Sequence, residues 1–277
     1  NIQAPDAAKL AVHWFESKQN EVAAEVADLF SKYRLSEALM AVYKLFWDEF
    51  SSWYLEMIKP AYGQGIDRTT YSATLCFLDN LLHLLHPFMP FITEELWQQM
   101  YERNAEEGES LMVSALSMDT YVDTAFVAQF EVVKGVISNI RSIRLQKNIA
   151  QKEPLDLQVL GENPVAEFNA VIQKMCNLSS ITVVESKAEG ASSFMVGTTE
   201  YAVPLGNMID VEAEIARMEA ELKHKEGFLQ GVLKKLSNEK FVNNAPAAVL
   251  EMERKKQADA ESIISSLKES IAALKKA

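Results

Sequence analysis

A heptad repeat of apolar residues near the C-terminus constrains the fold of this chain more strongly than any other feature. A repeat of seven places apolar side chains along one seam of a helix, and burying that seam requires a partner helix. The repeat fails only at Lys225. Its members are Val211, Ile215, Met218, Leu222, Leu229, Val232 and Leu236. A long helix with a helical partner is therefore predicted here.

The partner is predicted a few residues later in the same chain. The stretch 237–244 is polar, and Pro246 suits the first turn of a new helix. That helix carries a later apolar seam of Leu267, Ile271 and Leu274. Two helices of about 26 residues joined by a short turn form an antiparallel hairpin about 40 Å long. Residues 208–277 are predicted to form this coiled-coil arm.

Residues 1–150 are predicted to be a helical bundle, because apolar residues recur there with a helical period. The first four helices are expected from Asp6 toward Tyr33, from a cap at Ser36 to just before Pro60, from about Asp67 to His86, and from about Thr93 onward. A fifth begins at Asp123 and ends near Asn148. The second helix has the widest apolar stripe and is expected at the centre of the bundle. That stripe contains Leu39, Tyr43, Phe46, Phe50, Trp53 and Met57.

Residues 151–207 change to a different pattern. Leu155–Leu160 alternates apolar and polar residues as a strand does. Asn163-Pro164 is typical of a helix start, and Ile181–Val184 is a short β-branched run. Two further strands flank residues 197–200 as a hairpin. The predicted fold is mainly α, with a helical bundle, this small α/β module and the C-terminal hairpin.

The net charge of −12 argues against indiscriminate nucleic-acid binding, but the charge is unevenly distributed. Residues 223–256 hold eight Lys or Arg against four acids. A coiled coil used only for dimerisation does not need cations concentrated at its turn, and Phe241 adds an aromatic ring for base stacking. The predicted nucleic-acid contacts of the arm are Lys234, Lys235, Lys240, Phe241, Arg254, Lys255 and Lys256.

Two groups in the bundle leave alternatives open. Arg141, Arg144 and Lys147 are predicted to contact phosphates, or else to complement the negative end of a helix dipole. Trp47, Trp53 and Tyr54 can stack on bases, but their spacing on a wide stripe favours a place in the core.

Catalytic and metal-binding patterns are missing from the sequence. Cys76 and Cys176 stand far apart, and His83 and His86 have no further His or Cys near them, so no metal site is predicted. There is no glycine-rich phosphate loop and no run of 18 apolar residues. An unrecognised hydrolase using His83, His86 and Glu94 is one alternative to nucleic-acid binding. A helical scaffold whose hairpin pairs with another protein is a second alternative.

Several strings resemble a known family. Leu35-Ser-Glu-Ala-Leu39, Trp47-Asp-Glu-Phe-Ser-Ser-Trp-Tyr-Leu-Glu56 and His86-Pro-Phe-Met-Pro-Phe-Ile-Thr-Glu-Glu-Leu-Trp97 are similar to the helical anticodon-binding domain of the valyl, isoleucyl and leucyl class I synthetases. Ile140-Arg-Ser-Ile-Arg144 looks like the end of that domain. Leu236-Ser-Asn-Glu-Lys-Phe-Val-Asn-Asn-Ala-Pro246 resembles the C-terminal arm of valyl-tRNA synthetases. The resemblance covers essentially the whole chain.

The resemblance implies a tRNA-positioning part of an enzyme that joins valine to tRNA using ATP. In that family the arm lies against the outer corner of the L-shaped tRNA. The expected partners are tRNA(Val) and the remainder of the synthetase chain, with neither DNA nor a membrane, and the protein is expected to be a cytoplasmic monomer. The ATP signatures of the family are absent here, so no catalytic residue or cofactor is expected in this chain. ATP and Mg²⁺ would be used by the catalytic domain. Because residue 1 is not methionine, the chain is expected to begin at a cut within a longer protein.

Overall fold

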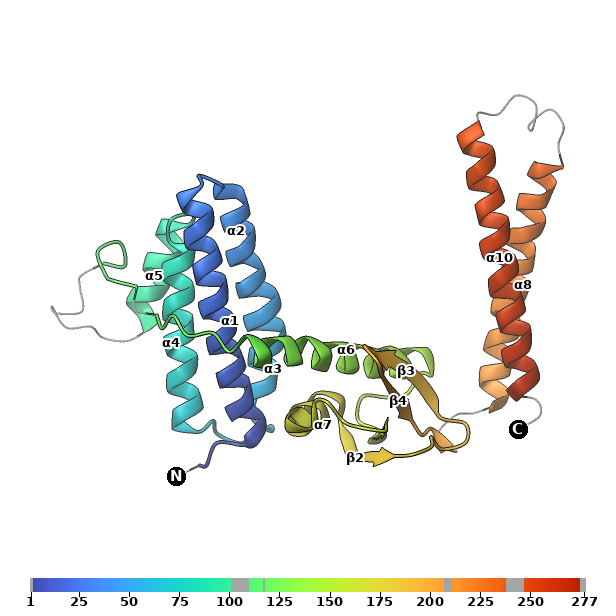
Figure 1. Cartoon of the computed structure of the whole chain (residues 1–277), viewed down its shortest axis with the longest axis horizontal. Coiled ribbons are helices and arrows are strands. Elements are labelled where there is room, and N and C mark those ends of the chain that lie inside the picture. The colour runs from blue at the N-terminus through green and yellow to red at the C-terminus, as the bar shows by residue number, and fades with distance from the viewer. Residues whose placement is uncertain (1, 101–109, 117, 207–210, 238–246, 275–277) are drawn as a thin grey trace. The chain divides into compact units, whose positions relative to one another are not determined.

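The computed structural model describes the chain except for residues 1, 101–109, 117, 207–210, 238–246 and 275–277 (Figure 1). The chain divides into two compact units, residues 1–204 and residues 205–277. The predicted bundle and α/β module therefore share one compact unit. The predicted arm corresponds to the second unit.

The bundle contains helices that follow the predicted order. They are α1 (Asp6–Ser31), α2 (Leu35–Lys44), the π-helical segment η1 (Leu45–Tyr54), α3 (Leu55–Ile58), α4 (Arg68–Leu85), α5 (Pro90–Met100) and α6 (Thr124–Gln146). Figure 1 shows α1, α2 and α4 running alongside one another. Asp67 and Asp123 cap α4 and α6 by accepting hydrogen bonds from Thr70 N and Phe126 N. Ser36 is not a cap, because α2 begins one residue earlier and Arg34 precedes it.

The segment η1 changes the direction of the side chains that follow it. Its backbone is π-helical, and the Ser51 and Ser52 hydroxyls each donate to the carbonyl five residues earlier, at 3.0 Å. An i→i+5 turn takes more residues than an α-turn, so the α-helical phase does not continue through it. Phe50 and Met57 of the predicted stripe are buried, whereas Leu39 and Tyr43 are exposed. The expected position of Leu39 and Tyr43 in the core is wrong for this reason.

An aromatic cluster forms the centre of the bundle. The Phe15 ring lies 5.2 Å from Phe50, 5.0 Å from Tyr54 and 5.1 Å from Phe77, centroid to centroid. These four rings come from α1, η1 and α4, so one apolar core joins the three elements. Burying rings of this size contributes strongly to stability through the hydrophobic effect.

The module is a four-stranded sheet with one helix. Its elements are β1 (Leu155–Leu160), η2 (Ala166–Phe168), α7 (Asn169–Cys176), β2 (Leu178–Val184), β3 (Ser192–Val196) and β4 (Thr199–Val203). The strand order is β2-β1-β4-β3, with β1 and β2 parallel and the other pairs antiparallel. The parallel pair needs a crossover, which η2 and α7 provide. The order along the chain is β-α-β-β-β, and the predicted first strand, helix, β-branched strand and hairpin are each present.

The module packs against the bundle through α6. The Phe168 ring lies 4.7 Å from Phe126, and Cys176 is buried beside this contact region. On the same helix, a Cβ atom built at Gly135 would lie 2.9 Å from a methyl carbon of Val196 in β3. Glycine in the middle of α6 thus allows the strand to approach the helix closely.

The second unit is a helical hairpin of α8 (Val211–Leu236) and α10 (Ala247–Leu274). The two helices pack against each other, and Lys268 pairs with Glu226 at 2.8 Å across the hairpin. The buried residues of the described part are Val232, Glu253, Ala260, Ile264 and Ile271. Val232 and Ile271 belong to the predicted seams, and the antiparallel hairpin is as predicted.

Candidate nucleic-acid interface

The cations at the far end of the hairpin separate into two groups. Lys235 and Lys256 contact the carboxylate of Glu253, at 3.8 and 2.8 Å. The other described cations at this end are Lys234, Arg254 and Lys255, and all three are exposed. Among the described residues, no acidic side chain contacts them. Lys240 and Phe241, also predicted to contact nucleic acid, lie outside the described residues.

Arg144 is not available to a ligand. It is 1% exposed, and its guanidinium donates to the carbonyls of Ala150 at 2.9 Å and Cys176 at 2.8 Å. A third, longer bond at 3.3 Å reaches the carbonyl of Asn177. Burial lowers the pKa of the Arg144 guanidinium from its ordinary value. The predicted phosphate contact of Arg144 is therefore wrong, since this side chain fastens the end of α6 to the end of α7.

Arg141 lies nearly one turn earlier on α6 and is exposed. Its guanidinium carbon is 5.6 Å from the centroid of the Trp53 ring, within the range of a cation–π contact. Lys147, the third predicted cation, is half-buried at the C-cap of α6. Arg141 remains the best placed of the three for an anionic ligand.

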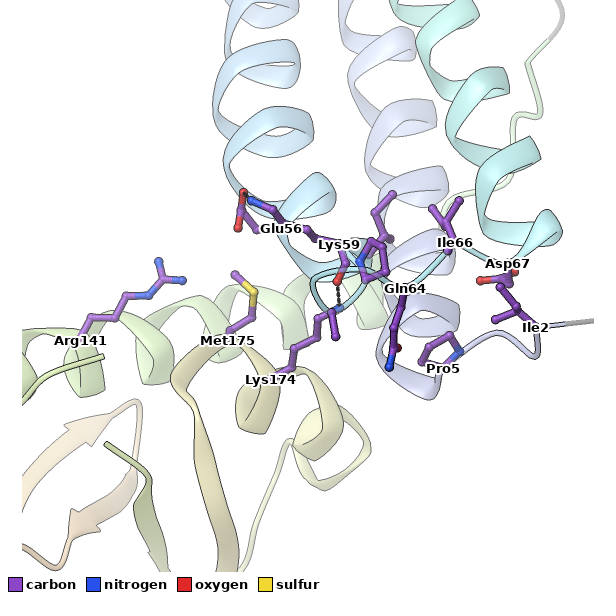
Figure 2. A pocket seen from close by; sticks show the side chains of 14 residues that line it. Ile2, Pro5, Glu56, Lys59, Gln64, Ile66, Asp67, Arg141, Lys174 and Met175 are labelled. Atoms are coloured by element: carbon purple, nitrogen blue, oxygen red, sulfur yellow. Dashed lines mark hydrogen bonds and ion pairs between the residues drawn. The ribbon is translucent and has the colours of Figure 1, made fainter. Parts of the chain in front are cut away.

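A cleft of about 450 Å³ opens beside Arg141 (Figure 2). Figure 2 shows Arg141 at one end, Asp67 and Ile66 at the other, and Lys174 between them. The lining residues come from the start of the chain, α3 with the turn that follows it, α6 and α7, and they include the acidic Glu56. The cleft therefore lies where the bundle and the module meet.

Lys174 fixes one wall of this cleft. Its ammonium donates to the carbonyls of Met57 at 2.6 Å and Lys59 at 2.8 Å, at the C-terminal end of α3. Burial lowers the pKa of Lys174 from its ordinary value, and the Glu56 carboxylate partly offsets this effect. An ammonium has three donors, so two bonds to carbonyls leave one for a ligand.

Asp67 supplies the opposite kind of group. It is 3% exposed, and one carboxylate oxygen accepts from Thr70 N at 2.8 Å. The other oxygen, Oδ2, is buried without a hydrogen-bond partner. Burial acts to raise the pKa of Asp67, but hydrogen bonds from Thr70 and backbone amides outweigh it, and the pKa is lowered. The cleft wall thus holds a buried, unpartnered acceptor at one end and Arg141 at the other, with Lys174 between them.

The three candidate stacking residues differ in burial. Tyr54 is fully buried and donates to or accepts from the Thr74 hydroxyl at 2.8 Å, so its predicted place in the core is confirmed. Trp53 is half-buried, and its ring is nearly perpendicular to that of Phe130, with the two centroids 6.0 Å apart. Trp47 is 60% exposed on η1, and its predicted burial is wrong.

His83 belongs to a network whose other members, Asp79 and Ser114, the sequence did not indicate. His83 Nε2 lies 2.8 Å from Ser114 Oγ, and His83 Nδ1 lies 2.9 Å from the Asp79 carbonyl and 3.3 Å from a carboxylate oxygen of the same residue. This order of groups resembles that of a serine hydrolase, but the Ser114 amide donates to the carbonyls of Ser110 and Leu111. That amide is therefore not free to stabilise an oxyanion.

The same network extends to Glu94, whose carboxylate accepts from Ser110 Oγ at 2.9 Å and Leu111 N at 3.0 Å. These contacts fasten the turn 110–114 to α4 and α5. The chain separation of the partners, from 16 to 31 residues, explains why no local motif revealed them. Within the described ranges, no group of three metal-ligating side chains gathers, and no helix is long and apolar enough to cross a membrane.

Each of the two units contains a match to a known protein family. The anticodon-binding domain of tRNA ligase matches residues 12–159, and the valyl tRNA synthetase tRNA binding arm matches residues 210–275. The chain is 99% identical over its full length to a valine–tRNA ligase of Bacteroides thetaiotaomicron and covers 32% of that protein.

More distant relatives show the same extent of coverage. A valine–tRNA ligase of Phocaeicola vulgatus is 72% identical over 276 residues, and one of Enterococcus faecalis is 35% identical over 279 residues. The chain spans about a third of the length of these relatives, 31% in both cases. With an anticodon-binding domain followed by a tRNA-binding arm, the chain belongs to the valine–tRNA ligase family and corresponds to its C-terminal, tRNA-binding part.

Proposed function

We propose that this chain holds tRNA(Val) at two surfaces, the cleft beside Arg141 and the basic end of the arm. The observation that carries the proposal is the cleft itself. Its cations suit the phosphates of an RNA loop, and the buried Oδ2 of Asp67 in the cleft wall lacks the hydrogen-bond partner that a donor on an inserted base would supply. Most of the lining, from Glu56 to Asp67 and at Arg141, lies within residues 12–159, which match the anticodon-binding family.

The chemistry of Asp67 restricts what the cleft selects. An ionised carboxylate only accepts hydrogen bonds, and the lowered pKa of Asp67 keeps it ionised at neutral pH. Bases that offer an exocyclic amino group, such as adenine and cytosine, would therefore be favoured over uracil at that position. Unpaired loop bases expose these edges, whereas paired RNA hides them. We infer that the cleft reads part of the anticodon loop.

The arm supplies affinity of a different kind. Lysine and arginine contacts to phosphates depend on salt and carry no sequence information by themselves. We assign them to the outer corner of the same tRNA, in a cytoplasmic monomer. The longer protein would join valine to this tRNA with ATP and Mg²⁺ in its catalytic part. The chain alone would give no valine-dependent pyrophosphate exchange above a protein-free control.

The test replaces Asp67 by Asn. Asparagine is as good a helix cap as aspartate, so α4 should keep its start while the unpartnered acceptor Oδ2 is replaced by a donor. The expected result is a loss of discrimination between tRNA(Val) and the same tRNA with an altered anticodon, by about 1–3 kcal/mol.

The matched control is Asp123→Asn, which makes the same change in the cap of α6, away from the cleft lining. It should leave tRNA binding unchanged. If Asp67→Asn and the unmodified chain distinguish the two tRNAs equally well, the proposal that the cleft reads the anticodon is wrong.

A further inference from the structure

Glu253 occupies a position in the arm where the heptad pattern expects an apolar side chain. It lies one heptad before Ala260, which is 3% exposed and faces α8 with Ile264 and Ile271. Glu253 is itself only 5% exposed. A charged group at a seam position usually costs stability, so its presence calls for a specific explanation.

The contacts of Glu253 are with two of the predicted RNA ligands. Lys256 Nζ donates to Glu253 Oε1 at 2.8 Å, and Lys235 Nζ reaches Oε2 from α8 at 3.8 Å. The longer of these is not a hydrogen bond, and Oε2 has no hydrogen-bond partner. The bond from Lys256 lowers the pKa of Glu253, so the carboxylate is charged at neutral pH.

Both lysine side chains are nevertheless still open to solvent. The exposed fraction is 60% for the side chain of Lys235 and 42% for that of Lys256. A phosphate can therefore approach either ammonium, but only in competition with a carboxylate already beside it. Lys234, Arg254 and Lys255 face no such competition among the described residues.

We propose that Glu253 is a specificity-determining residue of the arm. This inference rests on the tRNA-binding function proposed above. Its carboxylate partly neutralises Lys235 and Lys256 and so lowers the affinity of the arm for RNA in general. A flexible single strand can follow exposed cations in any arrangement, and it loses most from this masking. A folded tRNA presents phosphates at fixed positions, and it retains its affinity through the unmasked cations.

The experiment measures binding of the full 277-residue chain to tRNA(Val) and to an unstructured single-stranded RNA of equal length, at several salt concentrations. Glu253→Gln keeps the shape and removes the charge. Glu251→Gln removes the same charge from an exposed position on the same helix, and Glu253→Asp keeps the charge. Circular dichroism melting checks that each variant retains the hairpin.

Glu253→Gln should bind single-stranded RNA roughly tenfold more tightly and tRNA less than about threefold more tightly. Its salt slope should steepen by roughly 0.7–0.9 for each cation that gains a phosphate. Glu253→Asp should behave as the unmodified chain, and Glu251→Gln should change both RNAs equally and less.

The sign of the change separates this proposal from a purely structural role. Weaker binding of both RNAs by Glu253→Gln would show that Glu253 only supports the hairpin, and the proposal would fall. If Glu253→Gln and Glu251→Gln change RNA binding equally, the effect of Glu253 is only that of one negative charge on the arm. That result would also contradict the proposal. If the unmodified chain binds tRNA no better than single-stranded RNA, the proposed tRNA-binding function fails, and this inference fails with it.

Discussion

At the scale of residues, Arg141 and Arg144 show how position decides what an arginine does. Both lie on α6, three residues apart, and both are cations near the same helix end. Arg144 points into the junction with α7, where backbone carbonyls surround its guanidinium. Arg141 points into solvent over Trp53 and lines the cleft. The first holds the fold together, whereas the second is available to RNA.

Replacement by alanine should therefore affect mainly stability at Arg144 and mainly tRNA binding at Arg141. Arg144→Ala removes three hydrogen bonds from a charged donor and leaves carbonyls unpaired, so unfolding free energy should fall by about 3 kcal/mol or more. Arg141→Ala should lower it by no more than about 1 kcal/mol, through the lost contact with Trp53, but weaken tRNA binding. Urea denaturation and tRNA titration of both variants make the check. Equal stability losses would contradict the different environments described for the two residues.

At the scale of elements, local patterns predicted most helices and strands but failed where a distant contact decides. The helix-capping residue Asp123 predicted the start of α6, and the alternation of apolar and polar residues predicted β1. Both signals depend on residues only a few positions apart in the chain. The π-helical phase of η1 left Leu39 and Tyr43 exposed, and a strictly α-helical period does not anticipate it. In the candidate site, exposed Arg141 was predicted, but the presence of Asp67 and Lys174 in the wall of one cleft depends on the packing of α7.

Two glycines in helices give a test of such a distant contact. Alanine is favoured over glycine in a helix interior by about 1 kcal/mol. In Gly231→Ala the new Cβ of α8 meets nothing within 4 Å, so the arm should gain stability. In Gly135→Ala the new Cβ meets Val196 at 2.9 Å, so the first unit should lose stability. Thermal melting that shows a gain for both variants would mean that β3 does not approach α6 as closely as described.

The arm lysines make a second pair of matched variants. Lys234 and Lys255 are unmasked, and replacing both by alanine should flatten the salt slope of tRNA binding by up to about 0.7–0.9 per lost phosphate contact. The melting of the hairpin should not change, because both side chains are exposed. Replacing Lys235 and Lys256 leaves the buried Glu253 without its cations, so this double variant should also melt earlier. Identical melting of the two double variants would contradict the contacts of Glu253.

At the scale of the whole molecule, the net negative charge lies in one of the two units. Residues 210–277 contain twelve acids and twelve Lys or Arg, so the net charge of −12 lies in residues 1–209. An acidic body repels RNA in general, while local cations in the cleft and the arm attract it. Specific binding in such a molecule has to come from several favourable contacts made together.

Removing the arm tests this division. A chain ending at Gly206 keeps Leu205, which is 1% exposed, and keeps every element of the first unit. Because that unit has its own aromatic core, its unfolding free energy should change by less than about 0.5 kcal/mol. Its affinity for tRNA should fall steeply, since the remaining part carries the negative charge and has lost the exposed cations of α8 and α10. Urea denaturation followed by tRNA titration measures both quantities. Affinity that survives truncation unchanged would place the binding energy in the cleft and leave the arm without the part assigned to it.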